Sequence, residues 1–143
     1  MKLIVDSNII FTFFWEESVF SMIYLRNDLY LCTPEVFIEE LNKYEEEIQS
    51  KAKLNKQEFL ERKKELLNNL VIVPIEKYKE NLRVISEISN SLSEKEKMEL
   101  KNDADFLALA LKENCLLWSN DKLLKKQKSV EIITTRELIS LLS

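Results

Sequence analysis

The chain has 143 residues, of which 45% are hydrophobic and 32% charged, the proportions of an ordinary soluble globular protein. Its net charge of −4 gives no overall basic surface, so a nucleic-acid partner would have to be held by local groups. The absence of glycine excludes glycine-dependent phosphate loops, and the absence of histidine excludes imidazole bases and zinc–histidine sites.

Short apolar runs rich in β-branched residues alternate with longer helical patterns. The predicted strands are, in chain order, 2–5, 29–32, 71–73, 116–119 and 130–133. The predicted helices are 7–15, 18–26, 34–49, 56–69, 77–90, 103–114 and 135–142. Strands separated by helices predict right-handed crossovers and a mainly parallel sheet with helices on both faces. We see no repeat or second domain, and expect one domain over residues 1–143.

Several local signals mark where helices begin. Three pairs match or approximate a capping box, in which a polar side chain and an acid three residues later cap each other's backbone. They are Asn55 with Glu58, Ser93 with Glu96, and Thr134 with Glu137. Pro34 suits the first turn of its predicted helix. Without glycine, left-handed turns must fall on Asn, Asp or Lys.

The two cysteines and the hydropathy pattern indicate the compartment. Cys32 and Cys115 are far apart in sequence and lie in apolar runs, so we expect buried free thiols in a reducing cytoplasm. The longest apolar stretch, "IIFTFFW", is too short to span a membrane and lacks a basic leader. We expect a cytoplasmic protein with no membrane partner.

Four acidic residues are the most informative feature of the chain. Asp6 and Asp121 follow predicted strands, where ligands of parallel sheets bind, while Glu40 and Asp103 lie on predicted helices. Converging carboxylates are costly to desolvate unless a positive group compensates them. Mg²⁺ and Mn²⁺ prefer oxygen ligands, so the four acids indicate a site for a hard divalent cation.

Helix geometry separates these acids from their neighbours. At about 100° per residue, Glu40 falls on the apolar face of its helix, whereas Glu39 points away. On the helix predicted over 103–114, Asp103 lies on the same face as the apolar residues, and Asp105 lies on roughly the opposite side. We therefore keep Asp105 as a helix-start residue and a reserve metal ligand.

Each selected acid also has an ordinary structural alternative. Asp6, with Ser7 and Asn8 beside it, suits the cap of the first helix, and Asp121 suits the cap of the turn "KLLKK". Asp103 suits a helix start as well. Taken together, with two acids at strand ends, the four favour a functional site.

Three segments resemble the motifs of PIN-domain ribonucleases: "LIVDSNII", "TPEVFIEEL" and "DADFLALALKENCLLWSND". The resemblance covers essentially the whole chain in motif order and is greatest to small prokaryotic PIN proteins, many of them VapC-like toxins of toxin–antitoxin pairs. It implies a three-layer α/β/α fold whose mainly parallel sheet has about five strands. It places the family's acids at Asp6, Glu40, Asp103 and Asp121. Ser119 takes the place of the usual Thr or Ser.

The resemblance implies a metal-dependent endoribonuclease. One or two Mg²⁺ or Mn²⁺ ions on the four carboxylates would activate water for hydrolysis of an RNA phosphodiester. Ser7, Asn8 and Ser119 are expected to lie around the metal-binding acids and hold them in position, without binding the metal themselves. One departure is the missing glycine before Cys115, where Asn114 can take the left-handed conformation instead.

Partner surfaces are less marked in the sequence. Lys122, Lys125 and Lys126 follow Asp121 and suit RNA phosphates, although a solvated basic turn is an equal alternative. The apolar run ending in Trp15 suggests a homodimer or an antitoxin interface if Phe14 or Trp15 is exposed. Trp118 is expected in the core.

Two other functions remain open. One is a PIN-fold RNA- or protein-binding module without activity, which retention of all four acids argues against. The other is a phosphoacceptor domain, which requires adjacent acids after the first strand and a lysine after the last strand. The sequence has neither feature.

Overall fold

The computed structural model describes residues 1–15 and 17–143. Five strands form one sheet, and each closely matches a predicted strand. They are β1 (Lys2–Val5), β2 (Tyr30–Pro34), β3 (Val71–Val73), β4 (Leu116–Trp118) and β5 (Ile132–Ile133).

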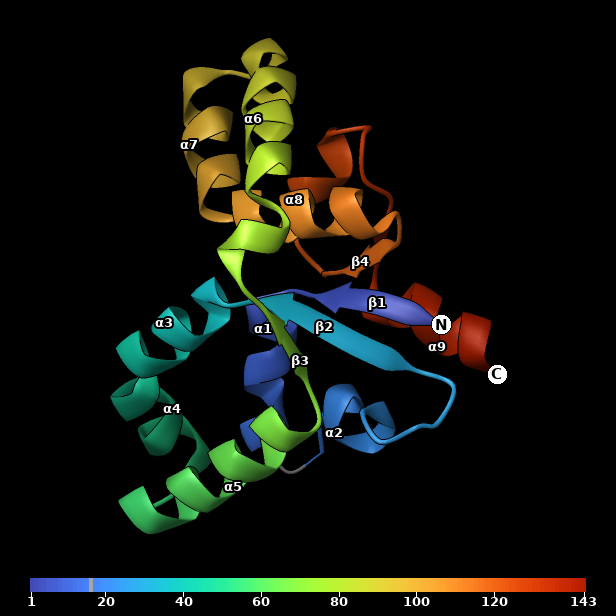
Figure 1. Ribbon diagram of the computed structural model, residues 1–143. Coiled ribbons are helices and arrows are strands. Elements are labelled where there is room, and N and C mark those ends of the chain that lie inside the picture. Colours follow the sequence, from blue (N-terminus) through green and yellow to red (C-terminus); the bar gives the residue numbers. More distant parts are fainter. Residues whose placement is uncertain (16) are drawn as a thin grey trace.

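Helices occupy most of the chain between the strands (Figure 1). The α-helices are α1 (Ser7–Phe11), α2 (Val19–Ile23), α3 (Val36–Lys43), α4 (Glu45–Ala52), α5 (Lys56–Asn68), α6 (Lys79–Ile88), α7 (Glu94–Asn102), α8 (Ala104–Glu113) and α9 (Thr135–Leu142). Four short 3₁₀ turns accompany them: η1 (Thr12–Phe14), η2 (Ile75–Lys77), η3 (Ser89–Ser91) and η4 (Leu124–Lys126).

The sheet is parallel throughout, in the order β3-β2-β1-β4-β5. The chain first winds outward from β1 through β2 to β3, then returns to the other side of β1 for β4 and β5. The direction of winding therefore reverses between β1 and β4, which pair with Val5 opposite Trp118. In open parallel sheets such a switch point, at the carboxyl ends of the strands, is where ligands bind.

Two hydrophobic cores cover the two faces of the sheet. Alternate residues of β1 point to opposite faces, so Leu3 and Val5 join one core while Ile4 joins the other. The first core is built from α1 to α5 with α9, and the second from α6 to α8. Figure 1 shows α6, α7 and α8 on one side of the sheet and α3, α4 and α5 on the other. The predicted three-layer α/β/α fold is confirmed.

The structure corrects the predicted elements at three places. Pro34 ends β2 and does not open a helix, because Glu35 comes between the strand and α3. The single helix predicted over 34–49 is two helices, separated at Tyr44, whose backbone (φ −101°, ψ 10°) leaves the α-region. A helix over Glu94–Asn102 had only its start predicted, and the Ser93–Glu96 capping box is present there.

Among residues 1–15 and 17–143, two non-glycine residues have a left-handed backbone. Lys53 (φ 55°) ends α4 and Asn114 (φ 51°) ends α8. Both belong to the predicted residue types, and Asn114 takes the left-handed conformation expected of it before Cys115. The capping boxes at Asn55 and Thr134 are formed as predicted.

No helix among residues 1–15 and 17–143 is both long and apolar enough to cross a bilayer.

Candidate active site

Asp6 directly follows β1, at the carboxyl end of the strand, where the winding of the sheet reverses between β1 and β4. Its backbone N–H donates to the Trp118 carbonyl at 3.0 Å, which extends the β1–β4 ladder by one residue. The side chain is buried and makes no capping hydrogen bond to α1, although Asp6 occupies the N-cap position. The Ser119 hydroxyl instead donates to Asp6 Oδ2 at 2.7 Å. Burial raises the pKa of Asp6 above its ordinary value, and the Ser119 hydrogen bond opposes that shift.

Ser119 joins the ends of the two central strands. It is fully buried directly after β4, and its Oγ also accepts from the Asp121 backbone N–H at 3.1 Å. Asp121 is exposed, and its Oδ1 accepts from the Leu123 N–H at 2.9 Å, so it does cap the following turn. The negative charge of Asp121 also raises the pKa of Asp6. One serine thus fixes the spacing between the two aspartates.

Glu40 reaches the same place from α3. Its side chain is partly buried, whereas the neighbouring Glu39 is exposed, as the helix-face argument expects. Burial raises the pKa of Glu40, and the charges of Asp6 and Asp105 raise it further. The Ser7 hydroxyl lies near enough to lower that pKa, but Ser7 Oγ has no partner in hydrogen-bonding geometry among the described residues.

Asp103 lies at the junction of α7 and α8. Its side chain caps neither helix, so the capping alternative does not describe it. Burial raises the pKa of Asp103 from 3.8 to about 7, and the charges of Asp6, Asp121 and Glu40 contribute. The four carboxylates are therefore close enough to repel one another, which is the convergence that the sequence predicts.

Asp105, the reserve ligand, has a partner of its own. The buried Tyr78 hydroxyl donates to Asp105 Oδ2 at 2.6 Å. Burial and this hydrogen bond raise the pKa of Tyr78, so the phenol stays protonated and remains a donor. Tyr78 thus connects the end of η2 to α8 and holds Asp105, whose charge contributes to the raised pKa of Glu40.

A cavity of ≈ 910 Å³ lies at this group of acids, and buried Asp6 is not among its lining residues. Glu40, Asp103, Asp105 and Asp121 line it, together with Asn8 from the first motif. Its walls are α1, η1, α3 and α4 on one side and α7, α8 and the segment after β4 on the other. We call this space the acidic cavity.

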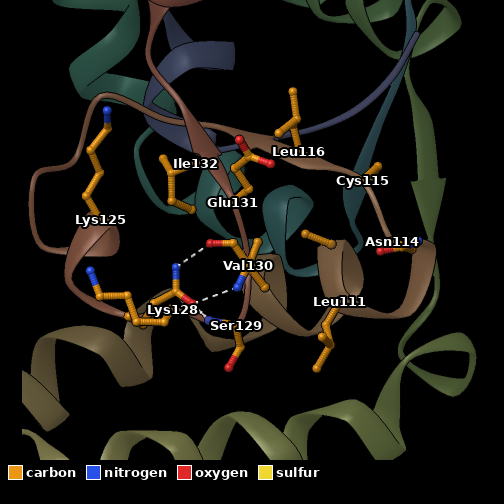
Figure 2. Close-up of a pocket in the computed structure, with 12 residues that line it drawn as sticks. Leu111, Asn114, Cys115, Leu116, Lys125, Lys128, Ser129, Val130, Glu131 and Ile132 are labelled. Atoms are coloured by element: carbon orange, nitrogen blue, oxygen red, sulfur yellow. Dashed lines mark hydrogen bonds between the residues drawn. The ribbon is translucent and has the colours of Figure 1, made fainter.

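A second cavity of ≈ 730 Å³ shares no lining residue with the first. Figure 2 shows its lining side chains from the end of α8, from β4, and from the segment leading into β5. Buried Gln127 closes one wall, because its Nε2 donates to the Val130 carbonyl and its Oε1 accepts from the Val130 N–H. No carboxylate of the predicted site lines this second cavity, so the second cavity is not part of the predicted site.

The predicted RNA-binding lysines lie outside the lining of the acidic cavity. Lys125 lines the second cavity and pairs with Glu137 at 2.7 Å, while Lys126 pairs with Glu96 at 2.8 Å. Lys122 is exposed directly after Asp121. Their contact with RNA stays a prediction.

The carboxylates fit a hard divalent cation by their chemistry. They offer only oxygen donors, and burial with mutual repulsion is relieved when a cation binds between them. Within residues 1–15 and 17–143, no three acidic or thiol side chains are placed to chelate one ion directly. Mg²⁺ commonly keeps several waters and takes only one or two protein carboxylates, so the donor set suits that mode of binding.

Two features of the site are absent from the sequence-based prediction. Tyr78 was not recognised as the partner of Asp105, and no local pattern links residues so far apart. The second feature is aromatic. Trp15 and Tyr44 line the acidic cavity with 37% and 38% of their surfaces exposed. Tyr44 had a signal in the sequence, because it lies four residues after Glu40 on the same predicted helix face.

Comparison with known proteins agrees with the fold. The profile of the PIN domain matches residues 4–142. VapBC2 from Rickettsia felis, solved bound to a DNA fragment from its promoter, contains a chain with a TM-score of 0.68 and 15% identity to this one. The alignment covers 94% of this chain and 98% of that one. No curated protein sequence matches.

Proposed function

Because this chain belongs to the PIN domain family, we propose that it is a metal-dependent endoribonuclease acting at the acidic cavity. The observation that carries the proposal is the mutual repulsion of four carboxylates at the β1–β4 switch point: Glu40, Asp103 and Asp121 line the acidic cavity, and Asp6 is buried near them. A binding module has no need to maintain such repulsion, whereas a cation site requires it.

We assign the binding of Mg²⁺ or Mn²⁺ to Asp6, Glu40, Asp103 and Asp121, with Asp105 in reserve. A divalent cation held by these residues would activate water near neutral pH and would offset negative charge on the scissile phosphate. The protein's own residues hold the carboxylates in position. Ser119 holds one oxygen of Asp6 by its 2.7 Å hydrogen bond.

Protonation of Asp103 sets a condition on cation binding. With its pKa raised to about 7, much of the cation-free protein carries a proton on this carboxyl at neutral pH. A cation therefore displaces that proton when it binds, which makes binding weaker in acid.

Cleavage of a mixed pool of structured and single-stranded RNAs tests the proposal. Wild type is compared with Asp6→Asn in Mn²⁺ and in EDTA. We expect cleavage only by wild type with Mn²⁺, and a loss of roughly 100-fold or more in Asp6→Asn. Full activity of Asp6→Asn would overturn the assignment of the site.

A matched pair on α3 sharpens that experiment. Glu40→Gln and Glu39→Gln make the same chemical change at adjacent positions, one facing the acidic cavity and one exposed. We expect Glu40→Gln to lose activity and Glu39→Gln to keep it. If wild type bound RNA without cutting it under any condition, the inactive RNA- or protein-binding module would take first place.

We also propose an antitoxin partner. The motif resemblance to toxin–antitoxin PIN proteins and the fold shared with VapBC2 support it. A small adjacent reading frame whose product restores growth to cells expressing this chain would bear it out. Unimpaired growth without any such product would favour an RNA-processing role. The homodimer and the cytoplasmic location stay predictions.

A further inference from the structure

Aromatic rings line one wall of the acidic cavity. Trp15, Tyr44 and Phe11 come from the end of η1, the α3–α4 break and α1, and all three belong to the lining. Phe14, next to Trp15, is buried, so Trp15 is the outward-facing end of the apolar run "IIFTFFW". The exposure of Trp15 thus opens into the cavity that holds the carboxylates.

The Tyr44 ring is held in place from two directions. The Phe11 ring meets it edge-on, with centroids 6.1 Å apart and planes at 69°. Lys43 Nζ lies 5.4 Å from the Tyr44 centroid. A ring whose orientation is already fixed loses little entropy when a planar ligand stacks on it.

Three lysines border the same cavity: Lys43, Lys51 and Lys101. Lys51 pairs with Glu47 at 2.9 Å, and among the described residues no ion pair is formed by Lys43 or Lys101. They flank the carboxylates from α3, α4 and α7, so cationic groups lie on both walls. Acids still outnumber lysines in the lining, which means that a polyanion needs a divalent cation over the carboxylates.

These features suit a nucleic-acid strand better than a protein surface. Protein interfaces need a contiguous exposed apolar area, whereas these rings lie in a cavity whose lining also holds acids and lysines. Rings beside cationic side chains are the usual grip on an unpaired strand, where base faces are free to stack and phosphates meet lysines.

We propose that Trp15 and Tyr44 are base-stacking positions, and that bases of an RNA strand bound in the acidic cavity lie against these two rings. This inference rests on the proposed nuclease function and adds the residues that choose the substrate. Paired bases have no free faces, so a duplex does not gain from either ring.

Fluorescence of the whole protein gives the first readout. The chain has two tryptophans, and Trp118 is fully buried, so a change on adding RNA reports Trp15. Ca²⁺ replaces Mn²⁺ to supply the cationic charge, with RNA integrity checked on a gel. We expect an unpaired RNA oligonucleotide to quench the signal and the same strand annealed to its complement to leave it nearly unchanged.

Variants and an abasic strand give the second readout, by fluorescence anisotropy of labelled RNA. Trp15→Leu and Tyr44→Leu should each weaken binding of the unpaired strand roughly ten-fold or more. Affinity for an abasic strand with the same phosphates should not change, and Trp15→Phe and Tyr44→Phe should retain binding. Tyr30→Leu is the matched control, since Tyr30 is 52% exposed outside the cavity.

Each contrary result is informative. Equal losses on the normal and abasic strands, or no loss on either, would overturn base stacking, as would failure of wild type to bind any RNA. An unchanged RNA affinity with an altered oligomeric mass in Trp15→Leu would assign Trp15 to a protein interface. Cleavage that depends on Asp6 but not on the rings would leave the nuclease intact and remove the stacking. Base stacking on the two rings without any cleavage would support the stacking positions and overturn the proposed nuclease function.

Discussion

Asp103 carries the largest pH effect among the acids of the cavity. Its pKa rises from 3.8 to about 7 through burial and through the charges of Asp6, Asp121 and Glu40. The folded chain thus binds this proton more tightly than the unfolded chain does. The resulting stability is fully present below about pH 4 and is lost as pH rises through about 7.

Asp103→Asn removes that charge and should stabilise the cation-free protein at alkaline pH. We expect its Tm to exceed that of wild type by roughly 2–4 °C near pH 8 in EDTA, with little difference near pH 4. Thermal unfolding followed by circular dichroism checks this, with Glu39→Gln as the exposed control. A gain of the same size at both pH values would contradict the electrostatic explanation.

Tyr78 offers a second change at the level of single atoms. Tyr78→Phe removes the donor to Asp105 and leaves a partly buried carboxylate without that hydrogen bond. We expect a loss of about 1–3 kcal/mol in the free energy of unfolding, measured with urea. Tyr30→Phe removes an exposed hydroxyl and should cost almost nothing. Equal effects of the two variants would mean that the Tyr78 hydrogen bond contributes no stability.

At the scale of elements, helix ends show where backbone strain is stored. Lys53 ends α4 in the left-handed conformation (φ 55°), which is unfavourable for a residue with a Cβ. Lys53→Gly should stabilise the fold by about 0.5–1 kcal/mol after the greater chain entropy of glycine is offset. Lys53→Ala keeps the Cβ and should give no gain in the same urea experiment. Asn114→Gly should gain less, because Asn tolerates this conformation.

The elements also show what local sequence determines. Strand positions and capping boxes were predicted because alternating apolar runs and cap pairs are local signals. The break at Tyr44 was missed because the apolar helix pattern continues across it, and only packing of α4 sets the new direction. Pro34 was misassigned because proline suits both a first helical turn and the end of a strand.

The sequence predicts the candidate site in the same way as the elements: local patterns select the acids, and contacts that depend on tertiary packing are missed. Helix periodicity favours Glu40 over Glu39 and Asp103 over Asp105. The charges of Glu40 and Asp103 interact with that of Asp6, but Asp105 lines the same cavity as Asp103. The contact between Tyr78 and Asp105 depends on how α6 packs on α8, which no local pattern encodes. The same holds for Trp15, whose exposure depends on tertiary packing around η1.

At the scale of the molecule, the acids join segments from both halves of the chain. Asp6 follows β1 and Glu40 lies on α3, whereas Asp103 and Asp121 come from the last third of the sequence. A cation bound between them stabilises the folded state alone. We expect Mn²⁺ at about 100 times its dissociation constant to add roughly 2.7 kcal/mol to the free energy of unfolding. Thermal melts across a Mn²⁺ titration measure this, and Asp6→Asn should abolish most of the shift. An equal shift in Asp6→Asn would place the ion elsewhere.

The strand order also has a consequence during synthesis. Translation proceeds from the amino end, and β1 finds β2 soon after it emerges but must wait for β4, its other neighbour, until most of the chain has been made. Until then one edge of the central strand is unpaired, and Asp6 lacks Ser119, Asp103 and Asp121. A nascent chain on the ribosome, surrounded by RNA, therefore carries only Asp6 and Glu40 of the four proposed site carboxylates and gains Asp103 and Asp121 late in its own translation.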